Sequence, residues 1–307
     1  MQRWRGYEAV PGGWGRSVVT IGVFDGVHRG HQAIIGHAVK RARDLGLQSV
    51  VVTFDPHPSE VVRPGSHPAV LTEPVRKADI LERLGVDVLC VLPFSIEFSR
   101  LDPAEFVHLV LIEKLHAAAV VVGENFRFGY KAAGDLDLLR TLGRKFGFAT
   151  EGVALLHDDD VTLSSTFVRS SIDAGEVARA AEALGRPHRV DGIVVRGAGR
   201  GRQLGYPTAN VRSERHVAVP ADGIYAGHVV LGDRVLPAAI SVGTNPTFEG
   251  RERTVEAYIL DFDEDIYGVE LGVEFVERVR GQVRFDGVEP LIEQMDKDVA
   301  QIRALLA

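Results

Sequence analysis

The pattern of apolar residues changes once along the chain, and this change constrains the fold more than any other feature of the sequence. Up to about Thr150, short β-branched runs alternate with stretches of helical spacing, which predicts an α/β domain with a parallel sheet covered by helices. After Pro187, short β runs follow one another without helices between them, which predicts a small closed or partly closed barrel. Over 290–306 the apolar residues lie on one side of a helix, so the barrel is expected to end in a C-terminal helix.

A length of 307 residues corresponds to about two domains. Asp173, followed by Glu176, predicts a helix that starts there and ends near Leu184. Gly185-Arg186-Pro187 breaks that helix, so we expect domains at 1–186 and 187–307. The first domain is expected to contain strands at 17–22, 49–54, 86–92 and 118–122 and helices at 31–45, 75–84, 103–115 and 135–146. The second is expected to contain strands at 192–195, 209–211, 224–231, 235–242, 254–261 and 269–279.

Composition excludes several classes of protein. With 45% hydrophobic and 25% charged residues, the chain is neither disordered nor collagen-like. Its net charge of −7 disfavours general nucleic-acid binding. The longest apolar run, 117–122, is far shorter than the roughly 18 residues of a membrane span, and residues 1–17 lack the apolar core of a signal peptide. The single cysteine, Cys90, permits neither an internal disulfide nor a cysteine zinc cluster.

These features predict a cytoplasmic protein that binds small molecules and neither nucleic acid nor a membrane. Nothing in the sequence predicts oligomerisation.

The turn after the first expected strand carries the strongest local signal, Gly22-Val23-Phe24-Asp25-Gly26-Val27-His28-Arg29-Gly30-His31. Its glycines let the backbone approach a ligand closely, and His28 and His31 share one face at a helix start. The N-terminus of a helix favours anions, and two imidazoles can donate hydrogen bonds to phosphate oxygens as charge develops on them. The sequence therefore predicts a phosphate site formed by Gly22, Phe24, Asp25, Gly26, His28 and His31. A surface turn with two incidental histidines is the alternative.

Three later segments of the first domain could contribute to that site. The segment 53–58 ends the second strand, at the edge of a parallel sheet where ligands bind, or it is simply a proline-locked turn. Asn125 follows the strand at 118–122 and could contact a base or ribose, whereas packing is favoured for Phe126 and Phe128. The third segment offers hydroxyls and a guanidinium for a triphosphate, from Ser164, Ser165, Thr166 and Arg169. For the two serines, a plain helix N-cap is the alternative.

The second domain opens with a glycine-rich stretch that ends in Pro207-Thr208-Ala209-Asn210. Such a flexible backbone can wrap phosphates, and Gly192, Gly197, Arg202, Gly205 and Pro207 are its candidate binding residues. The Thr208 hydroxyl and the Asn210 amide are hard oxygen donors that suit Mg²⁺ bound to phosphates. Glu256 lies among apolar neighbours, which favours a general base; a solvated strand face is the alternative.

Taken together, the motifs G-x-F-D-G-x-H-x-G-H and L-G-x-P-T-A-N closely resemble the bacterial bifunctional riboflavin kinase/FAD synthetase family. The resemblance implies a Rossmann-like nucleotidyltransferase domain followed by a six-stranded antiparallel flavokinase barrel. In the barrel, it implies that Thr208 and Asn210 organise Mg²⁺ and ATP, while Glu256 accepts the proton of the riboflavin 5′-hydroxyl as FMN forms. In the first domain, it implies that His28 and His31 stabilise attack of FMN on a second ATP, which yields FAD and pyrophosphate.

The sequence departs from that family at two places. Asn125 replaces the usual aspartate, and Gln282 and Arg284 lie where the family tends to carry an acidic residue and a lysine. Two alternative functions remain open. One is a nucleotidyltransferase with another phosphate acceptor and a non-catalytic flavin-binding barrel. The other is a flavin-binding module without catalysis, which leaves the two phosphate loops unexplained.

Overall fold

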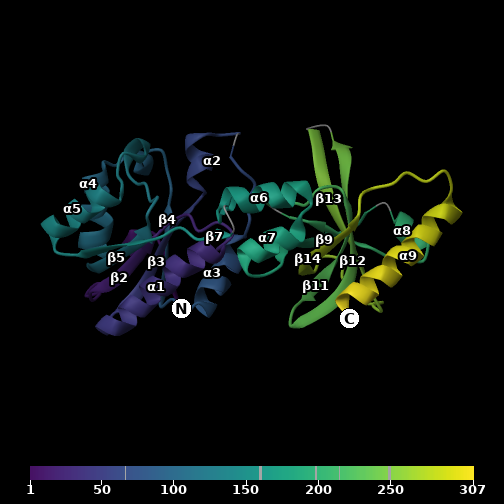
Figure 1. Cartoon of the computed structure of the whole chain (residues 1–307), viewed down its shortest axis with the longest axis horizontal. Helices are drawn as coiled ribbons and strands as arrows, with labels where there is room; N and C mark the ends of the chain where they lie inside the picture. The colour runs from purple at the N-terminus through teal and green to yellow at the C-terminus, as the bar shows by residue number, and fades with distance from the viewer. Residues whose placement is uncertain (66, 159–160, 198, 214, 248–249) are drawn as a thin grey trace. The chain divides into compact units, whose positions relative to one another are not determined.

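A computed structural model describes residues 1–65, 67–158, 161–197, 199–213, 215–247 and 250–307 (Figure 1). It separates into two compact units. Unit 1 comprises Met1–Pro68 and Pro74–Leu163, and unit 2 comprises Ala69–Glu73 and Ser164–Ala307. The expected fold class is confirmed, because unit 1 contains a parallel sheet with helices and unit 2 a closed barrel with a C-terminal helix. Within the described ranges, no helix combines the length and the apolar character needed to cross a membrane.

Unit 1 is built on a six-stranded sheet in the order β1-β4-β3-β2-β5-β6, and each neighbouring pair of strands is parallel. Its strands are β1 Gln2–Arg5, β2 Ser17–Ile21, β3 Gln48–Asp55, β4 Val88–Pro93, β5 Ala117–Gly123 and β6 Ala149–Val153. A small hairpin adds β7 His157–Asp158 and β8 Val161–Thr162. Its helices are α1 Arg29–Leu45, α2 Pro58–Val62, α3 Pro74–Arg83, α4 Pro103–Phe106 and α5 Leu136–Phe146.

The sheet is buried on both faces, which explains its continuous β-branched runs. Val51 on one face packs with α1 and α3, whereas Val50 and Val52 on the other pack with α5 and the helix over 103–114. Sequence did not predict β1 and β6. Both are edge strands, and Trp4 is the only buried residue of β1.

Two expected helices differ in detail. The helix expected over 103–115 forms as α4 and then continues as a π-helix, Val107–Lys114. The helix expected to start at Asp173 is a wrong prediction, because Asp173 lies near the end of α6, Ser165–Ala174. Gly175 ends α6 in the left-handed conformation at φ 79°, and α7, Val177–Leu184, follows. Asp173 pairs with Arg253 at 3.1 Å instead of capping a helix.

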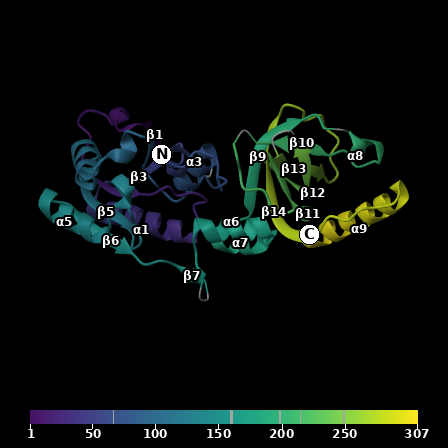
Figure 2. The same ribbon diagram turned by 90° about the horizontal axis from the view of Figure 1, so that it is seen from above.

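Unit 2 is a closed barrel in the strand order β10-β13-β12-β11-β14-β9 (Figure 2). Its strands are antiparallel: β9 His188–Val195, β10 Ala209–Arg212, β11 Gly223–Leu231, β12 Arg234–Thr247, β13 Gly250–Ile259 and β14 Glu270–Arg280. The short helix α8, Arg200–Gln203, interrupts the glycine-rich loop. The long helix α9, Val288–Leu306, packs against β11, β12 and β14 (Figure 1).

One buried ion pair fastens α9 to the barrel. The Arg280 guanidinium of β14 contacts both carboxylate oxygens of Asp298, the closest at 2.6 Å. Gln294, one turn earlier in α9, donates a hydrogen bond to the same carboxylate at 2.8 Å. Fully buried Ile302 adds an apolar contact with Leu260. The pair is satisfied by several hydrogen bonds, which a buried charge requires.

The single cysteine lies inside unit 1. Cys90 of β4 is fully buried, and burial raises the pKa of its thiol to about 12. The thiol is therefore protonated at neutral pH and is a poor nucleophile.

Closure of the barrel depends on a close approach of two strands at Gly227. The register between β11 and β14 shifts beside this residue, and a Cβ there would collide with the carbonyl oxygen of Glu274. Gly243 of β12 is a matched control, because its added Cβ would meet nothing nearer than Gln282 at 3.8 Å.

We expect Gly227→Ala to lower the free energy of unfolding of unit 2 by about 1–3 kcal/mol, the usual cost of overpacking. Gly243→Ala should change it little. Both tryptophans, Trp4 and Trp14, lie in unit 1, so tryptophan fluorescence reports the unfolding of that unit alone. In Gly227→Ala, the midpoint of urea unfolding measured by circular dichroism should therefore fall more than the midpoint measured by tryptophan fluorescence. Equal stability of the two variants would contradict the proposed clash.

Candidate active sites

The order of the strands in unit 1 locates its first site. The chain moves from β2 outward through β3 and β4, then returns to place β5 on the other side of β2. Ligands of parallel sheets bind at the carboxyl ends of the strands where the order reverses. The Gly22–His31 turn follows β2 and Asn125 follows β5, so both predicted segments lie at that edge.

The turn between β2 and α1 has an uncommon backbone. Positive φ angles occur at Phe24 (48°), Gly26 (81°) and Val27 (41°), and a buried, β-branched residue such as Val27 rarely adopts one. Such strain persists only where surrounding contacts determine the conformation. Here the Gln32 side chain donates to the Val27 carbonyl at 2.8 Å. Thr53 of β3 donates to the carbonyl of Val23 at 2.9 Å.

The two histidines of this turn lie together. Their rings stack with centroids 3.6 Å apart, and the Phe24 ring meets His31 edge-on at 5.2 Å. His28 is buried and caps α1, because its Nδ1 accepts a hydrogen bond from the backbone N–H of His31 at 3.4 Å. When Nδ1 accepts in the neutral ring, Nε2 carries the proton, so Nε2–H of His28 is the group that can donate to a ligand.

His31 is held in its neutral form. Burial, followed by the charges of His28 and Lys77, keeps the pKa of His31 well below the usual range of histidine. Its Nδ1 is buried and lacks a hydrogen-bond partner among the described residues. A buried polar atom without a partner is costly, and a bound ligand could satisfy this one.

The other residues predicted near the first site differ in exposure. Asn125 is exposed, and its Oδ1 would lie 3.1 Å from a Cβ at Gly123. Phe128 is buried in the core of unit 1, with Phe126 stacked on it at 5.4 Å, so the packing interpretation of both rings is confirmed. At the end of β3 and β4, sequence reasoning missed a cluster of aromatic rings that contact one another, Phe54, Phe94 and Phe98.

The hydroxyl segment belongs to unit 2. Ser164 caps α6, since its Oγ accepts from the backbone of Phe167 at 3.1 Å, as in the N-cap alternative. Ser165 and Thr166 form the first turn of α6, and Arg169 Nε donates to the Ala69 carbonyl at 2.7 Å. A role of these residues in triphosphate binding stays a prediction.

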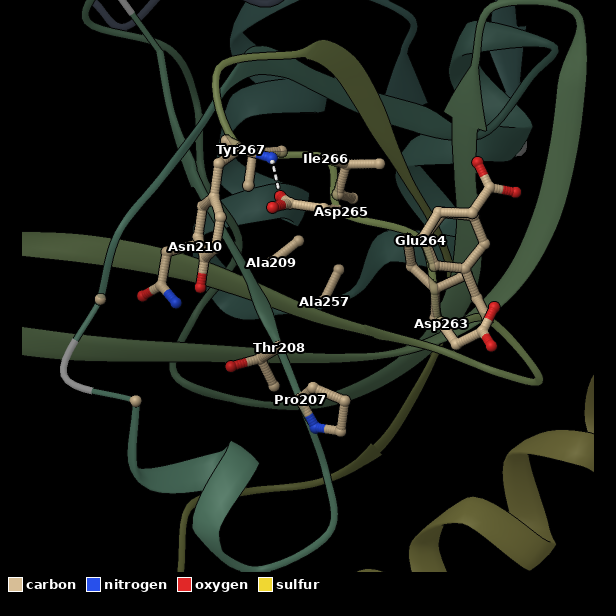
Figure 3. A pocket seen from close by; sticks show the side chains of 15 residues that line it. Pro207, Thr208, Ala209, Asn210, Ala257, Asp263, Glu264, Asp265, Ile266 and Tyr267 are labelled. Atoms are coloured by element: carbon tan, nitrogen blue, oxygen red, sulfur yellow. Dashed lines mark hydrogen bonds between the residues drawn. The ribbon is translucent and has the colours of Figure 1, made fainter.

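A cavity of about 350 Å³ opens at one end of the barrel (Figure 3). Its walls come from the glycine-rich loop, from β10 and β13, and from the loop before β14. They include the predicted residues Gly197, Pro207, Thr208 and Asn210. They also include Asp263, Glu264, Asp265 and Tyr267, which were not predicted from sequence. Tyr267 stacks on Arg196 at 5.4 Å, and its N–H donates to Asp265 at 3.1 Å.

Thr208 and Asn210 line this cavity, and Glu256, which is not among the lining residues, contacts Thr208. The Thr208 hydroxyl donates to a Glu256 carboxylate oxygen at 3.1 Å. Asn210 pairs with Glu256 in the register of β10 with β13, and Glu256 pairs in turn with Ser241 of β12. Figure 3 shows the Thr208 and Asn210 side chains pointing to the same side. Beyond Ser241, Gln282 donates to the Ser241 hydroxyl at 3.3 Å and to the Val242 carbonyl at 2.9 Å.

The remaining predicted residues of the loop differ in position. Gly197 makes room for Asn210, because a Cβ there would lie 2.5 Å from the amide nitrogen of Asn210. Gly192 lies within β9, against the Arg212 carbonyl, and outside the lining of the cavity. Gly205 adopts φ 88° in the loop after α8. The side chain of Arg202 lies outside the described part of the structure.

The oxygen donors of this site fit magnesium. Mg²⁺ binds through one or two protein ligands together with waters and substrate phosphates, and the Thr208 hydroxyl and Asn210 amide form such a sparse set. Among the described residues, no group of three or more His, Cys, Asp or Glu side chains could hold a metal on its own. The donors therefore suit a cation that arrives with a nucleotide better than a transition metal.

Comparison with known proteins divides the chain into two family segments. A family model described as FAD synthetase matches residues 12–167, and one described as riboflavin kinase matches residues 184–306. The bifunctional riboflavin kinase/FMN adenylyltransferase of Pseudomonas fluorescens is 39% identical, over 94% of this chain and 93% of its own length. The protein of the same name from Listeria monocytogenes is 37% identical, over 94% and 92%.

A crystal structure from Streptococcus pneumoniae superimposes with a TM-score of 0.90 and 34% identity over 99% of both chains. It is described as a macrolide-efflux protein, and that description applies to the neighbour alone. The two family models and the near full-length relatives show that this chain belongs to the bifunctional riboflavin kinase/FMN adenylyltransferase family, whose transferases make flavin cofactors.

Proposed function

We propose that Thr208, Asn210 and Glu256 carry out the riboflavin kinase reaction in the barrel, and that His28 and His31 serve the adenylyltransferase reaction in unit 1. The first reaction converts riboflavin and ATP to FMN and ADP. The second converts FMN and a second ATP to FAD and pyrophosphate. The observation that carries the assignment is the Thr208–Glu256 hydrogen bond at 3.1 Å, on a cavity that Asn210 also lines.

In the kinase reaction, the 5′-hydroxyl of riboflavin loses a proton as its oxygen attacks the γ-phosphate of ATP. Glu256 accepts this proton through the carboxylate oxygen that Thr208 does not occupy. Because Thr208 directs its hydroxyl hydrogen at Glu256, the lone pairs of its oxygen point elsewhere and can ligate a cation together with Asn210. Bound Mg²⁺ would neutralise charge on the phosphate oxygens. Phosphoryl transfer needs mainly positioning and charge stabilisation, which this rigid barrel wall supports.

In the adenylyltransferase reaction, a phosphate oxygen of FMN attacks the α-phosphate of ATP and pyrophosphate leaves. Nε2–H of His28 and a neutral His31 donate hydrogen bonds to the oxygens on which negative charge develops. Neither histidine forms a covalent bond to the nucleotide. Because both reactions consume ATP, we place the protein in the cytoplasm, with ATP, riboflavin and FMN as its partners.

We expect Glu256→Gln to slow FMN formation by about 10²–10⁴-fold, the usual contribution of a general base. The glutamine keeps an oxygen that accepts from Thr208, so the cavity wall is preserved. Product chromatography should show that FAD formation from supplied FMN stays within about twofold of the unaltered protein, since Glu256 belongs to unit 2 and the histidine turn to unit 1 and sites without shared partners act independently. An equal loss of both reactions would contradict the assignment of the two reactions to separate sites.

His28→Asn tests the first site in the opposite direction. Asparagine is a good N-cap residue and preserves the start of α1, but it lacks the imidazole Nε2–H. We expect FAD formation from FMN to fall about 10²–10³-fold, as for loss of one donor to a transition state, while FMN formation from riboflavin persists. Unchanged FAD formation would remove His28 from the proposed site.

A further inference from the structure

A lysine from a different part of the chain reaches the turn that bears the two histidines. Lys77 lies on α3, and its Nζ donates a hydrogen bond to the carbonyl of Val23 at 2.9 Å. Thr53 donates to the same oxygen at the same distance. The partly buried ammonium is therefore fixed at the carboxyl end of β2 rather than extended into solvent.

The site has a chemical need for such a charge. His31 is neutral, for the reasons given above, and a neutral imidazole donates a hydrogen bond without a full positive charge. In adenylyl transfer a bond forms from the FMN phosphate oxygen to the α-phosphorus. The bond from that phosphorus to the pyrophosphate oxygen breaks, and pyrophosphate leaves with the electron pair. Negative charge moves onto the leaving group, and a fixed cation in a partly buried site stabilises such charge strongly.

Lys77 also interacts with His31 electrostatically. Two charged or titratable groups lower the pKa of His31, His28 at the start of α1 and Lys77 on α3, and both disfavour its protonation. Buried Asp25 belongs to the same turn. The ammonium and the imidazole thus share one small region, although 46 positions separate them in the chain.

We propose that Lys77 is a further catalytic residue of the adenylyltransferase, whose ammonium binds the triphosphate of ATP and stabilises charge on the departing pyrophosphate. An ammonium carries three N–H donors, so a bond to the Val23 carbonyl is compatible with one to a phosphate oxygen. The inference rests on the proposed function of unit 1 and adds a group to it. Lys77 forms no covalent bond in the reaction.

A purely structural role for Lys77 is the competing explanation. The lysine could act only as a brace for the strained turn. Because Thr53 holds the same carbonyl, removal of Lys77 leaves one of the two anchors in place. If Lys77 had only this structural role, its charge would not affect the pKa of His31. An arginine at position 77 would then support FAD formation no better than a neutral residue.

The test uses the full chain and compares Lys77→Met, Lys77→Arg and the control Arg83→Met. Arg83 is an exposed residue on the same helix, so the control removes an equal charge. We expect Lys77→Met to lower kcat for FAD formation about 10²-fold, Lys77→Arg to recover part of this loss, and Arg83→Met to have little effect. Riboflavin phosphorylation by the same molecules should be unchanged, which serves as an internal check of folding.

The pH profile supplies a second readout. A nearby cation disfavours the imidazolium form, so loss of the Lys77 charge should raise the pKa of His31. The acid limb of kcat/KM for FAD formation should therefore move to higher pH in Lys77→Met and stay in place in Arg83→Met. If Lys77→Met unfolds unit 1, as judged by tryptophan fluorescence, Lys77→Gln replaces it with the same expected outcomes.

Three results would overturn the inference: unaltered FAD formation in Lys77→Met, no difference between the methionine and arginine variants, or an unmoved acid limb. These results differ from failure of the proposed function. In that case the unaltered protein itself would form no FAD from FMN and ATP, or His28→Asn would leave the reaction unchanged.

Discussion

Asn210, Glu256 and Ser241 occupy matched positions on three neighbouring strands of the barrel, and strand register is the constraint on which the kinase site depends. Side chains alternate between the two faces of a strand, so a slip of one strand by one residue would turn its side chain away from the other two. Elsewhere in the barrel, Gly227 allows the close approach of β11 and β14. The same principle holds in unit 1, where the parallel register of β2 with β3 brings Thr53 to the carbonyl that anchors the histidine turn.

The two proposed sites achieve rigidity in different ways. In unit 2 the side chains proposed for catalysis lie on or beside the barrel strands. Gly197 leaves the space that the Asn210 amide fills. In unit 1 they lie on a turn with positive φ at Phe24 and Val27, each costing about 1–3 kcal/mol. Buried contacts and side-chain hydrogen bonds from β3, α1 and α3 offset that cost. A group held in place before substrate binds loses little entropy in the transition state.

Sequence patterns predicted the architecture well because burial on two faces, or closure into a barrel, leaves a strong apolar periodicity. They missed β1 and β6, whose sequences are polar because each lies at an edge of the sheet. They misplaced a helix start at Asp173, where Gly175 separates two helices. Thr208 and Asn210 were predicted together because they are adjacent in sequence, and both line the cavity of the barrel. Lys77 was not found, because a lysine on an amphipathic helix looks like a solvated one until tertiary structure brings it to His31.

The burial of Cys90 has a practical consequence. Its thiol is protonated and inaccessible, and the chain contains no other cysteine. Cysteines introduced on the surface would therefore take up a maleimide dye or spin label without competition from the native thiol. One such label in each unit would report the separation of the kinase and adenylyltransferase domains during turnover, in a protein whose native thiol needs no replacement.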